Sequence, residues 1–143
     1  MARNARNELD DLYGEVILDH CRNPRFHDVV EPAGLRADGV NPFCGDEVHV
    51  QIALAGGRAA RVGVQSQGCS INRASASMMA GAIHGKTIPE IEALASAFRA
   101  MIRGESSGNG LGDLDAMAGV REFPVRIKCA LLPWSTLEDA VGG

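Results

Sequence analysis

Hydrophobic residues follow two different periods in the first half of the chain. They recur every three or four positions between Glu8 and Asp19, which is the spacing of one helix face. Asn23-Pro24 ends this predicted helix, because a residue before proline disfavours helical backbone. From Val48 to Leu54 apolar and polar residues alternate one by one, as in a half-buried strand. Gly56-Gly57 signals a turn into a second strand over Arg58 to Gln65, and the two strands predict a hairpin.

The second half of the chain has the pattern of helices. We expect them over three ranges: Ser70 to His84, Ile88 to Ile102 and Pro124 to Val141. Thr87 is a suitable N-cap for the second of these helices, and Pro133 is expected to bend or break the third. Arg103 to Gly112 is rich in glycine and serine, which is typical of a loop. Leu114 to Met117 predicts one short helix.

The order of these elements is a helix, then strands, then helices, which predicts an α+β fold. A short strand before Asn41 is expected to complete a small antiparallel sheet of about three strands, with helices packed on it. Neither a repeat nor a linker interrupts the pattern. We therefore expect residues 1–143 to form a single domain.

Composition and charge limit the kinds of partner. Hydrophobic residues make up 45% of the 143 residues and charged residues 22%, the balance of a globular protein. The formal net charge of -4 leaves no basic footprint for nucleic acid. No apolar run approaches the roughly 18 residues of a membrane span, and Met1 to Asp10 lacks the apolar core of a signal peptide. We expect a cytoplasmic protein that binds neither nucleic acid nor membrane.

The candidate chemistry lies in the cysteines. The chain has four of them: Cys21, Cys44, Cys69 and Cys129. An even number is compatible with disulfides, but the reducing cytosol favours metal or redox chemistry. No local Cys-x-x-Cys pair is present, so spacing alone is a weak signal for a metal. The surroundings of each cysteine therefore decide its role.

The first candidate segment is Asn41-Pro-Phe-Cys-Gly-Asp46. Pro42 and Gly45 form a turn just before a strand. Cys44 and Asp46 are two positions apart and share one side of extended backbone. Zinc accepts both a thiolate and a carboxylate as ligands. A turn with a buried cysteine and a solvated aspartate explains the segment about equally well.

The second segment is Gln67-Gly-Cys-Ser70, at the predicted junction of a strand and a helix. A cysteine at a helix N-terminus meets free backbone N–H groups and the positive end of the helix dipole. Both favour the thiolate, which is the form that binds metals and attacks sulfur. The competing explanation for Cys69 is a small apolar residue at a tight junction.

The third segment is Arg126-Ile-Lys-Cys129, in the early turns of the last predicted helix. Arg126 and Lys128 place positive charge beside Cys129. Three thiolates and a carboxylate around Zn²⁺ carry an excess of negative charge, which such cations offset. A core cysteine beside two surface cations is the simpler alternative. All three segments place a cysteine at the edge of an element, where ligands from distant parts of the sequence converge.

Cys21 differs from the other three cysteines. It follows His20 at the end of the first predicted helix, and adjacent residues on a helix point about 100° apart. The two side chains are therefore a poor ligand pair, and we interpret Cys21 as a residue outside the site.

These segments resemble the IscU/SufU family of iron–sulfur cluster assembly proteins. The motifs that carry the resemblance are Asn41-Pro-Phe-Cys-Gly-Asp46, Gly68-Cys-Ser-Ile71 running into Ala74-Ser-Ala-Ser-Met-Met79, and Phe123-Pro-Val-Arg-Ile-Lys-Cys-Ala-Leu-Leu-Pro-Trp134. Leu12-Tyr13 and Asp19-His20, followed by Asn23-Pro24-Arg25, match the first segment of the family. The resemblance extends from about Leu9 to Val141 and implies an IscU/SufU-like fold.

Two features are similar to the SufU-type branch of that family. Lys128 precedes Cys129 at the position where IscU scaffolds carry a histidine. The stretch between Cys69 and Cys129 is also longer than in IscU, with extra residues around Arg99 to Val120.

The resemblance implies a zinc site and a role as a sulfurtransferase. The ligands carried over from the family are Cys44, Asp46, Cys69 and Cys129. The implied partner is a pyridoxal-phosphate cysteine desulfurase of the SufS type, which forms a persulfide and hands on its outer sulfur. The sulfur then passes to the iron–sulfur assembly scaffold complex.

Cys44 is the expected sulfur acceptor. It lies on a turn next to Gly45, where it should be more exposed than the two cysteines at helix starts. Thiol exchange needs a nucleophilic thiolate and an accessible sulfur, and a Cys44 freed from metal has both. Arg126 and Lys128 are candidates for docking the partner or for offsetting the negative charge of the site.

Three other interpretations compete with sulfur relay. A scaffold would hold a [2Fe–2S] cluster on the same cysteines, since thiolates suit both metals. A regulator would use zinc only for structure and activate the desulfurase by binding it. A zinc-free α+β domain with incidental cysteines is the least specific of the three.

Overall fold

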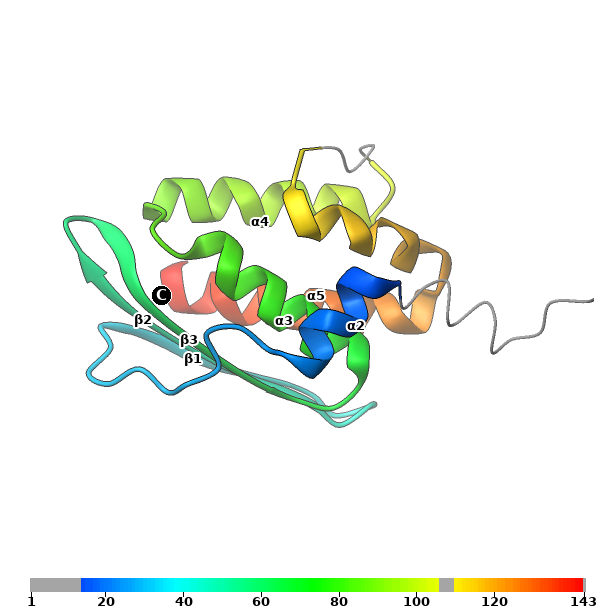
Figure 1. Ribbon diagram of the computed structural model, residues 1–143, viewed down its shortest axis with the longest axis horizontal. Helices are drawn as coiled ribbons and strands as arrows, with labels where there is room; N and C mark the ends of the chain where they lie inside the picture. The colour runs from blue at the N-terminus through cyan, green and yellow to red at the C-terminus, as the bar shows by residue number, and fades with distance from the viewer. Residues whose placement is uncertain (1–13, 106–109, 143) are drawn as a thin grey trace, which may run out of the picture.

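A computed structural model describes residues 14–105 and 110–142. Its elements are α2 (Glu15–Arg22), β1 (Leu35–Asn41), β2 (Asp46–Ala55), β3 (Arg58–Gln67), α3 (Ser70–Ile83), α4 (Ile88–Ile102), the 3-10 helix η1 (Gly112–Glu122) and α5 (Pro124–Gly142). Figure 1 shows the strands at one side of the molecule and the helices stacked beside them. The predicted α+β fold is confirmed. The extent of the domain, residues 1–143, stays a prediction.

The sheet is antiparallel, with the strand order β1-β2-β3. The alternation in β2 places Val48, Val50 and Ile52 on the buried face, each with no exposed surface. Gly56 and Gly57 both have positive φ, at 61° and 76°, and form the predicted hairpin turn. The expected third strand is β1, which pairs with β2 from Leu35↔Ile52 to Asn41↔Asp46.

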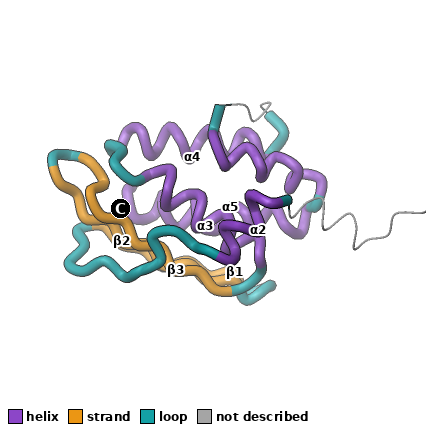
Figure 2. The backbone as a smooth tube through the Cα atoms, viewed as in Figure 1, coloured by secondary structure: helices purple, strands orange, loops and turns teal. Residues whose placement is uncertain are grey.

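Helices cover one face of this sheet. α3 packs against β3, and α5 packs against β1 and β2. α4 lies beyond this helix pair, while α2 lies beside α3 (Figure 2). Small buried residues on α3, from Ala74 to Ser77, let the helix approach its neighbours closely. The core therefore lies between the sheet and the helices, and it fixes the starts of α3 and α5 relative to the strands.

A buried hydrogen-bonded group joins α3 to α5. The hydroxyl of Ser75 donates to the carbonyl oxygen of Ala130 at 2.7 Å, and the indole Nε1–H of Trp134 donates to Ser75 Oγ at 3.2 Å. Trp134 also stacks on Phe98 of α4, with 4.7 Å between ring centroids. α5 continues through Pro133 instead of breaking there. This group holds the helix on both sides of Pro133. Its tertiary contacts therefore override the tendency of an interior proline to break a helix.

The predicted helix bounds hold in part. Thr87 begins α4 with a capping box, in which its hydroxyl accepts from the Glu90 N–H at 3.3 Å and Glu90 accepts from the Thr87 N–H at 2.9 Å. The first helix runs past Asp19 to Arg22, and its predicted start lies outside the described residues, as does the Leu12-Tyr13 motif. The short helix expected around Leu114 is longer, because η1 spans Gly112–Glu122.

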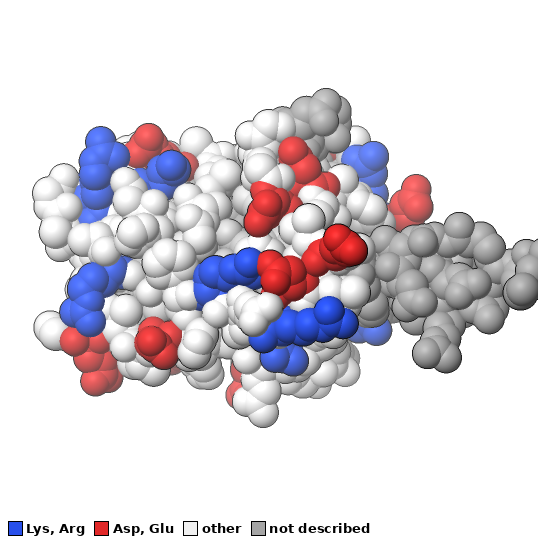
Figure 3. Space-filling view, in the orientation of Figure 1, with Lys and Arg blue, Asp and Glu red and all other residues white. Residues whose placement is uncertain are grey.

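The surface shows mixed charge. On the face in Figure 3, acidic and basic side chains lie side by side over α2 and its neighbours. Arg25 and Asp19 form one such ion pair, which holds the pKa of the Asp19 carboxyl below its ordinary value. Among the described residues, no helix is long and apolar enough to cross a membrane.

Ser75→Ala should lower the free energy of unfolding by about 1–3 kcal/mol, because the carbonyl of Ala130 and the indole N–H of Trp134 then lose a buried partner. Urea unfolding measures this loss. Ser66→Ala is the matched control, since Ser66 is only half-buried on β3. Equal losses in the two variants would contradict the role given to Ser75.

Candidate metal centre

Three chain segments meet at one end of the sheet. They are the turn between β1 and β2, the start of α3 and the first turns of α5 (Figure 1). Ligand atoms of Cys44, Asp46 and Cys129 all lie within 4.8 Å of one another. Cys69 adjoins this group, with its Sγ 3.8 Å from Asp46 Oδ2. The structure thus brings together all four residues that the sequence singles out.

The turn that carries Cys44 is closed by its own backbone. The Gly45 N–H donates to the Asn41 carbonyl at 2.8 Å, and the Phe43 N–H donates to Asn41 Oδ1 at 3.1 Å. Gly45 has a φ of 73°, a conformation that glycine adopts without a steric penalty. Cys44 is exposed at the tip of this turn.

Asp46 lies at the centre of the cluster and has no exposed surface, so it is not the solvated aspartate of the alternative interpretation. Its Oδ1 accepts the backbone N–H of Cys69 at 2.9 Å, and its Oδ2 accepts the thiol of Cys44 at 3.1 Å. Burial opposes ionisation, but these hydrogen bonds and those from the other thiols outweigh it. They hold the pKa of the Asp46 carboxyl below its ordinary value.

Cys69 is the N-cap residue of α3, at the helix start that the sequence predicts. Its sulfur accepts the backbone N–H of Asn72 at 3.5 Å, and the residue is half-buried. The side-chain amide of Asn72 donates to the carbonyl oxygens of Gln67, at 3.2 Å, and Glu47, at 3.4 Å. This amide therefore ties the start of α3 to the ends of both neighbouring strands.

Cys129 lies deepest of the three clustered thiols and has no exposed surface. Burial, followed by the neighbouring Asp46 and Cys69, raises the pKa of the Cys129 thiol. The main cause is that a buried thiolate loses the solvation of water, and a further negative charge beside Asp46 and Cys69 adds to the cost. A divalent cation held by these residues would offset both effects and favour deprotonated sulfur.

The two predicted cations lie next to the cluster on α5. Arg126 is half-buried and Lys128 is exposed. Nζ of Lys128 lies 5.9 Å from the centroid of the Phe43 ring, so this cation reaches across to the turn that carries Cys44.

Cys21 and His20 take part in contacts outside the cluster. The thiol of Cys21 donates to the carbonyl oxygen of Ser70 at 3.1 Å. The buried ring of His20 bridges α3 and η1, with Nδ1 2.7 Å from Ser77 Oγ and Nε2 2.9 Å from Asp113 Oδ2. Sequence reasoning missed this bridge. The available signal was spacing, because His20 follows the apolar Ile17 by three positions and so shares its helix face.

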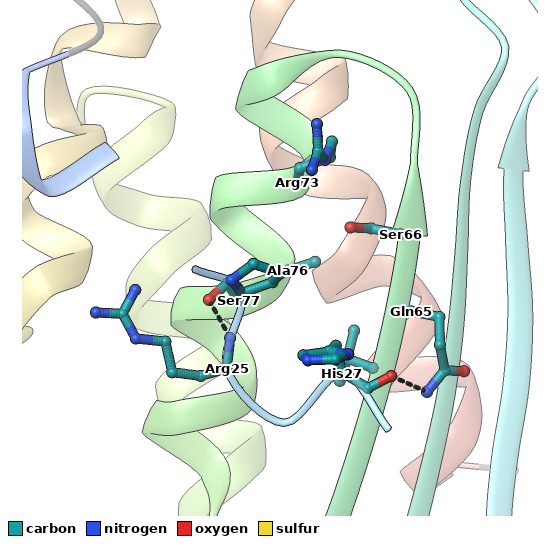
Figure 4. A pocket seen from close by; sticks show the side chains of 9 residues that line it. Arg25, His27, Gln65, Ser66, Arg73, Ala76 and Ser77 are labelled. Carbon is teal, nitrogen blue, oxygen red and sulfur yellow. Dashed lines mark hydrogen bonds between the residues drawn. The ribbon is translucent and has the colours of Figure 1, made fainter. Parts of the chain in front are cut away.

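A separate pocket of about 250 Å³ lies between β3 and α3. In Figure 4 the guanidinium group of Arg25 points away from His27 and Gln65. The backbone N–H of Arg25 donates to Ser77 Oγ at 2.9 Å. Gln65 Nε2–H donates to the carbonyl oxygen of His27 at 3.2 Å. None of the four clustered residues lines this pocket, so it does not extend the cysteine cluster.

Residues 12–141 match the protein family described as NifU-like N terminal domain. The chain belongs to the NifU-like N-terminal domain family. The predicted IscU/SufU relationship is thereby confirmed.

Relatives of this NifU-like domain include both SufU and IscU proteins. The chain is 42% identical over 135 residues to the zinc-dependent sulfurtransferase SufU of Bacillus subtilis, covering 93% of this chain and 91% of that protein. It is 36% identical over 142 residues to the iron–sulfur cluster assembly scaffold protein IscU of Streptococcus pyogenes, covering 96% and 87%.

Solved structures share the fold. The crystal structure of FiSufU from Fervidobacterium islandicum AW-1, named for iron–sulfur cluster assembly in the SUF system, superposes with a TM-score of 0.85 at 35% identity. That alignment covers 91% of this chain and 96% of the other. The NifU-like N-terminal protein of Brucella abortus, at 24% identity, has a TM-score of 0.85 and covers 94% of each chain.

The donor atoms of this NifU-like domain fit zinc. A zinc–sulfur bond is about 2.3 Å long and a zinc–oxygen bond about 2.0–2.2 Å, so a sulfur and an oxygen ligand of a tetrahedral zinc lie about 3.6 Å apart. The thiol–carboxylate separations are 3.1 Å for Cys44 and 3.8 Å for Cys69, one on either side of that spacing. Thiolates and a carboxylate are also ligand types that zinc binds.

Gly68 allows the close approach of Cys69 to Asp46. A Cβ at this position would lie 2.0 Å from Asp46 Oδ1, and φ is 126°. Gly68→Ala should therefore lower the free energy of unfolding by about 3 kcal/mol or more, through backbone strain and overpacking. Urea unfolding with a metal chelator present measures the loss.

Gly45→Ala is the control for backbone strain alone. A Cβ at Gly45 meets no atom within 4 Å, although φ is 73°. The expected loss is about 1–2 kcal/mol. Similar losses at the two glycines would show that contact with Asp46 does not constrain position 68.

Proposed function

We propose that this chain is a zinc-containing sulfur-relay protein of iron–sulfur cluster assembly. It accepts sulfur on Cys44 from the persulfide of a pyridoxal-phosphate cysteine desulfurase of the SufS type, and passes it to the assembly scaffold complex. The observation that carries the proposal is an exposed thiol on a turn, hydrogen-bonded to a buried carboxylate beside two less accessible thiols. In enzyme terms this is a sulfurtransferase.

The transfer step is a thiol exchange. The Cys44 thiolate attacks the outer sulfur of the donor persulfide, a new S–S bond forms on Cys44, and the donor cysteine leaves as a thiolate. No external oxidant or reductant is consumed, because the S–S bond that forms replaces the one that breaks. Cys44 suits this step because its sulfur is accessible, whereas Cys129 is buried.

The proposed zinc ligands are Cys44, Asp46, Cys69 and Cys129. When bound, zinc keeps thiolates deprotonated at neutral pH. The protein's own contribution is geometric: the Cys69 amide orients Asp46, while the first turns of α5 hold Cys129 below the surface. Arg126 and Lys128 are proposed to offset the negative charge of the ligands and to help dock the partner.

One comparison and one feature of the structure support this function. The relative that is 42% identical over almost the whole chain is named a zinc-dependent sulfurtransferase. The exposed position of Cys44 agrees with an acceptor that meets a large partner. The IscU relatives at 36% and 33% identity favour one alternative, a scaffold on which a [2Fe–2S] cluster is assembled by the same cysteines.

The purified protein should contain about one zinc per chain, measured by elemental analysis. Cys69→Ser and Cys129→Ser should each lose most of this metal, because serine oxygen is a poor replacement for a thiolate on zinc. Cys21→Ser is the control and should retain it. Iron with a visible chromophore in the wild-type protein would favour the scaffold alternative.

Incubation with the desulfurase and free cysteine should place a persulfide on Cys44, detected by mass spectrometry of alkylated peptides. Cys44→Ala should abolish both this label and the stimulation of desulfurase turnover, since no other clustered thiol is exposed. Cys21→Ser should behave like the wild type. Full stimulation by Cys44→Ala would show that Cys44 is not the acceptor.

A further inference from the structure

A groove of about 370 Å³ opens beside Cys44, between the β1–β2 turn and α5. Its walls include Val40, Pro42, Phe43, Lys128, Leu131 and Leu132. The groove is distinct from the cysteine cluster, because none of the four clustered residues lines it. The wall formed by residues 40–43 is mainly apolar, while the helical wall combines Leu131 and Leu132 with polar and cationic side chains.

Phe43 is the most exposed large apolar residue of the described chain, at 92%, and it directly precedes Cys44. Val125, at 75%, and Val40, at 61%, are the next most exposed. Exposed apolar side chains that gather in one place are a mark of an interaction site. Here Val40 and Phe43 both line the groove beside the turn that carries Cys44. Val125 lies in the first turn of α5, where its carbonyl oxygen is 3.8 Å from Cys129 Sγ.

The ring of Phe43 and the thiol of Cys44 belong to one rigid turn. Both Phe43 and Gly45 donate backbone hydrogen bonds to Asn41. Phe43 directly precedes Cys44 and is 92% exposed, so a protein large enough to reach Cys44 lies close to this ring.

The charge of the groove indicates the chemistry of its occupant. Among the described residues that line it, two are cations, Lys128 and Arg99, and none is a carboxylate, although the chain carries a net charge of -4. Arg99 is paired with Glu138 and held by Ser135. Lys128 lies over the Phe43 ring, where it offers its charge to an incoming group.

We propose that this groove docks the protein that donates sulfur to Cys44, through an apolar side chain flanked by aspartate or glutamate. The apolar side chain packs between the Phe43 ring and α5, and the acidic group pairs with Lys128. This inference rests on the proposed sulfur relay and adds the surface and the chemistry by which the donor is recognised.

The test measures desulfurase turnover against the concentration of this chain, with a purified SufS-type desulfurase. Phe43→Ser should raise the half-saturating concentration roughly ten-fold or more, the loss expected when a buried aromatic contact is removed. Its zinc content and maximal turnover should match the wild type. Lys128→Glu should raise the half-saturating concentration more than Lys128→Gln does, because it repels an acidic partner.

Leu54→Ser is the matched control. Leu54 is an exposed apolar residue, at 44%, near the opposite end of β2 from the cluster. Labelling of Cys44 by a small persulfide, cysteine persulfide, should proceed at the same rate in wild type and Phe43→Ser, because a small donor needs no docking groove.

Three outcomes would overturn the inference, and they differ from one another. If Phe43→Ser activates the desulfurase as well as Leu54→Ser does, the groove is not the docking surface. If Phe43→Ser also slows labelling by cysteine persulfide, the ring acts on Cys44 itself and not on docking. If wild-type protein accepts no sulfur from the desulfurase, the proposed relay itself fails, and the docking surface fails with it.

Discussion

The hydrogen bond from the Cys69 amide to the buried carboxylate of Asp46 is the contact on which the site depends. Asp46 begins β2 and Cys69 caps α3, so this 2.9 Å bond joins two segments that the sequence keeps far apart. A buried carboxylate is costly unless its oxygens are hydrogen-bonded. The amide meets that need on one oxygen and the thiols on the other. Gly68 makes the arrangement possible, because any Cβ there would occupy the place of Asp46 Oδ1.

The third segment reaches the cluster through core packing. α5 is held against α3 by the hydroxyl of Ser75, which joins the carbonyl of Ala130 and the indole of Trp134. Cys129 lies immediately before Ala130, so its depth is set by the same contact. The position of a candidate ligand thus follows from a helix–helix contact that contains no ligand. A change at Ser75 therefore acts on the position of Cys129, whereas a change at Gly68 acts on the contact between Cys69 and Asp46.

Local patterns were enough to predict the elements and the edges at which the cysteines lie. The alternation of Val48, Val50 and Ile52 determines which face of β2 is buried, and Thr87 determines where α4 begins. The burial of Asp46 was not predictable, because its partner is a backbone amide 23 positions away. The bridge made by His20 likewise depends on Asp113, 93 positions away. Such contacts have no local period and arise only when the helices pack on the sheet.

The backbone also sets which of the proposed ligands can move with least disturbance to the fold. Movement of Cys69 would disturb the N-cap of α3 and the bond to Asp46 together. Movement of Cys129 would draw a fully buried residue out of α5. Cys44 is held by its turn, whose hydrogen bonds run within Asn41 to Gly45, and by one thiol–carboxylate contact of 3.1 Å. Among the described residues, its departure therefore breaks one side-chain hydrogen bond, the bond to Asp46. The proposed sulfur relay requires this inequality, since two of the proposed ligands must stay while one sulfur meets the partner. Here the inequality follows from the placement of Cys69 at a helix N-cap, Cys129 in the early turns of α5 and Cys44 on a turn.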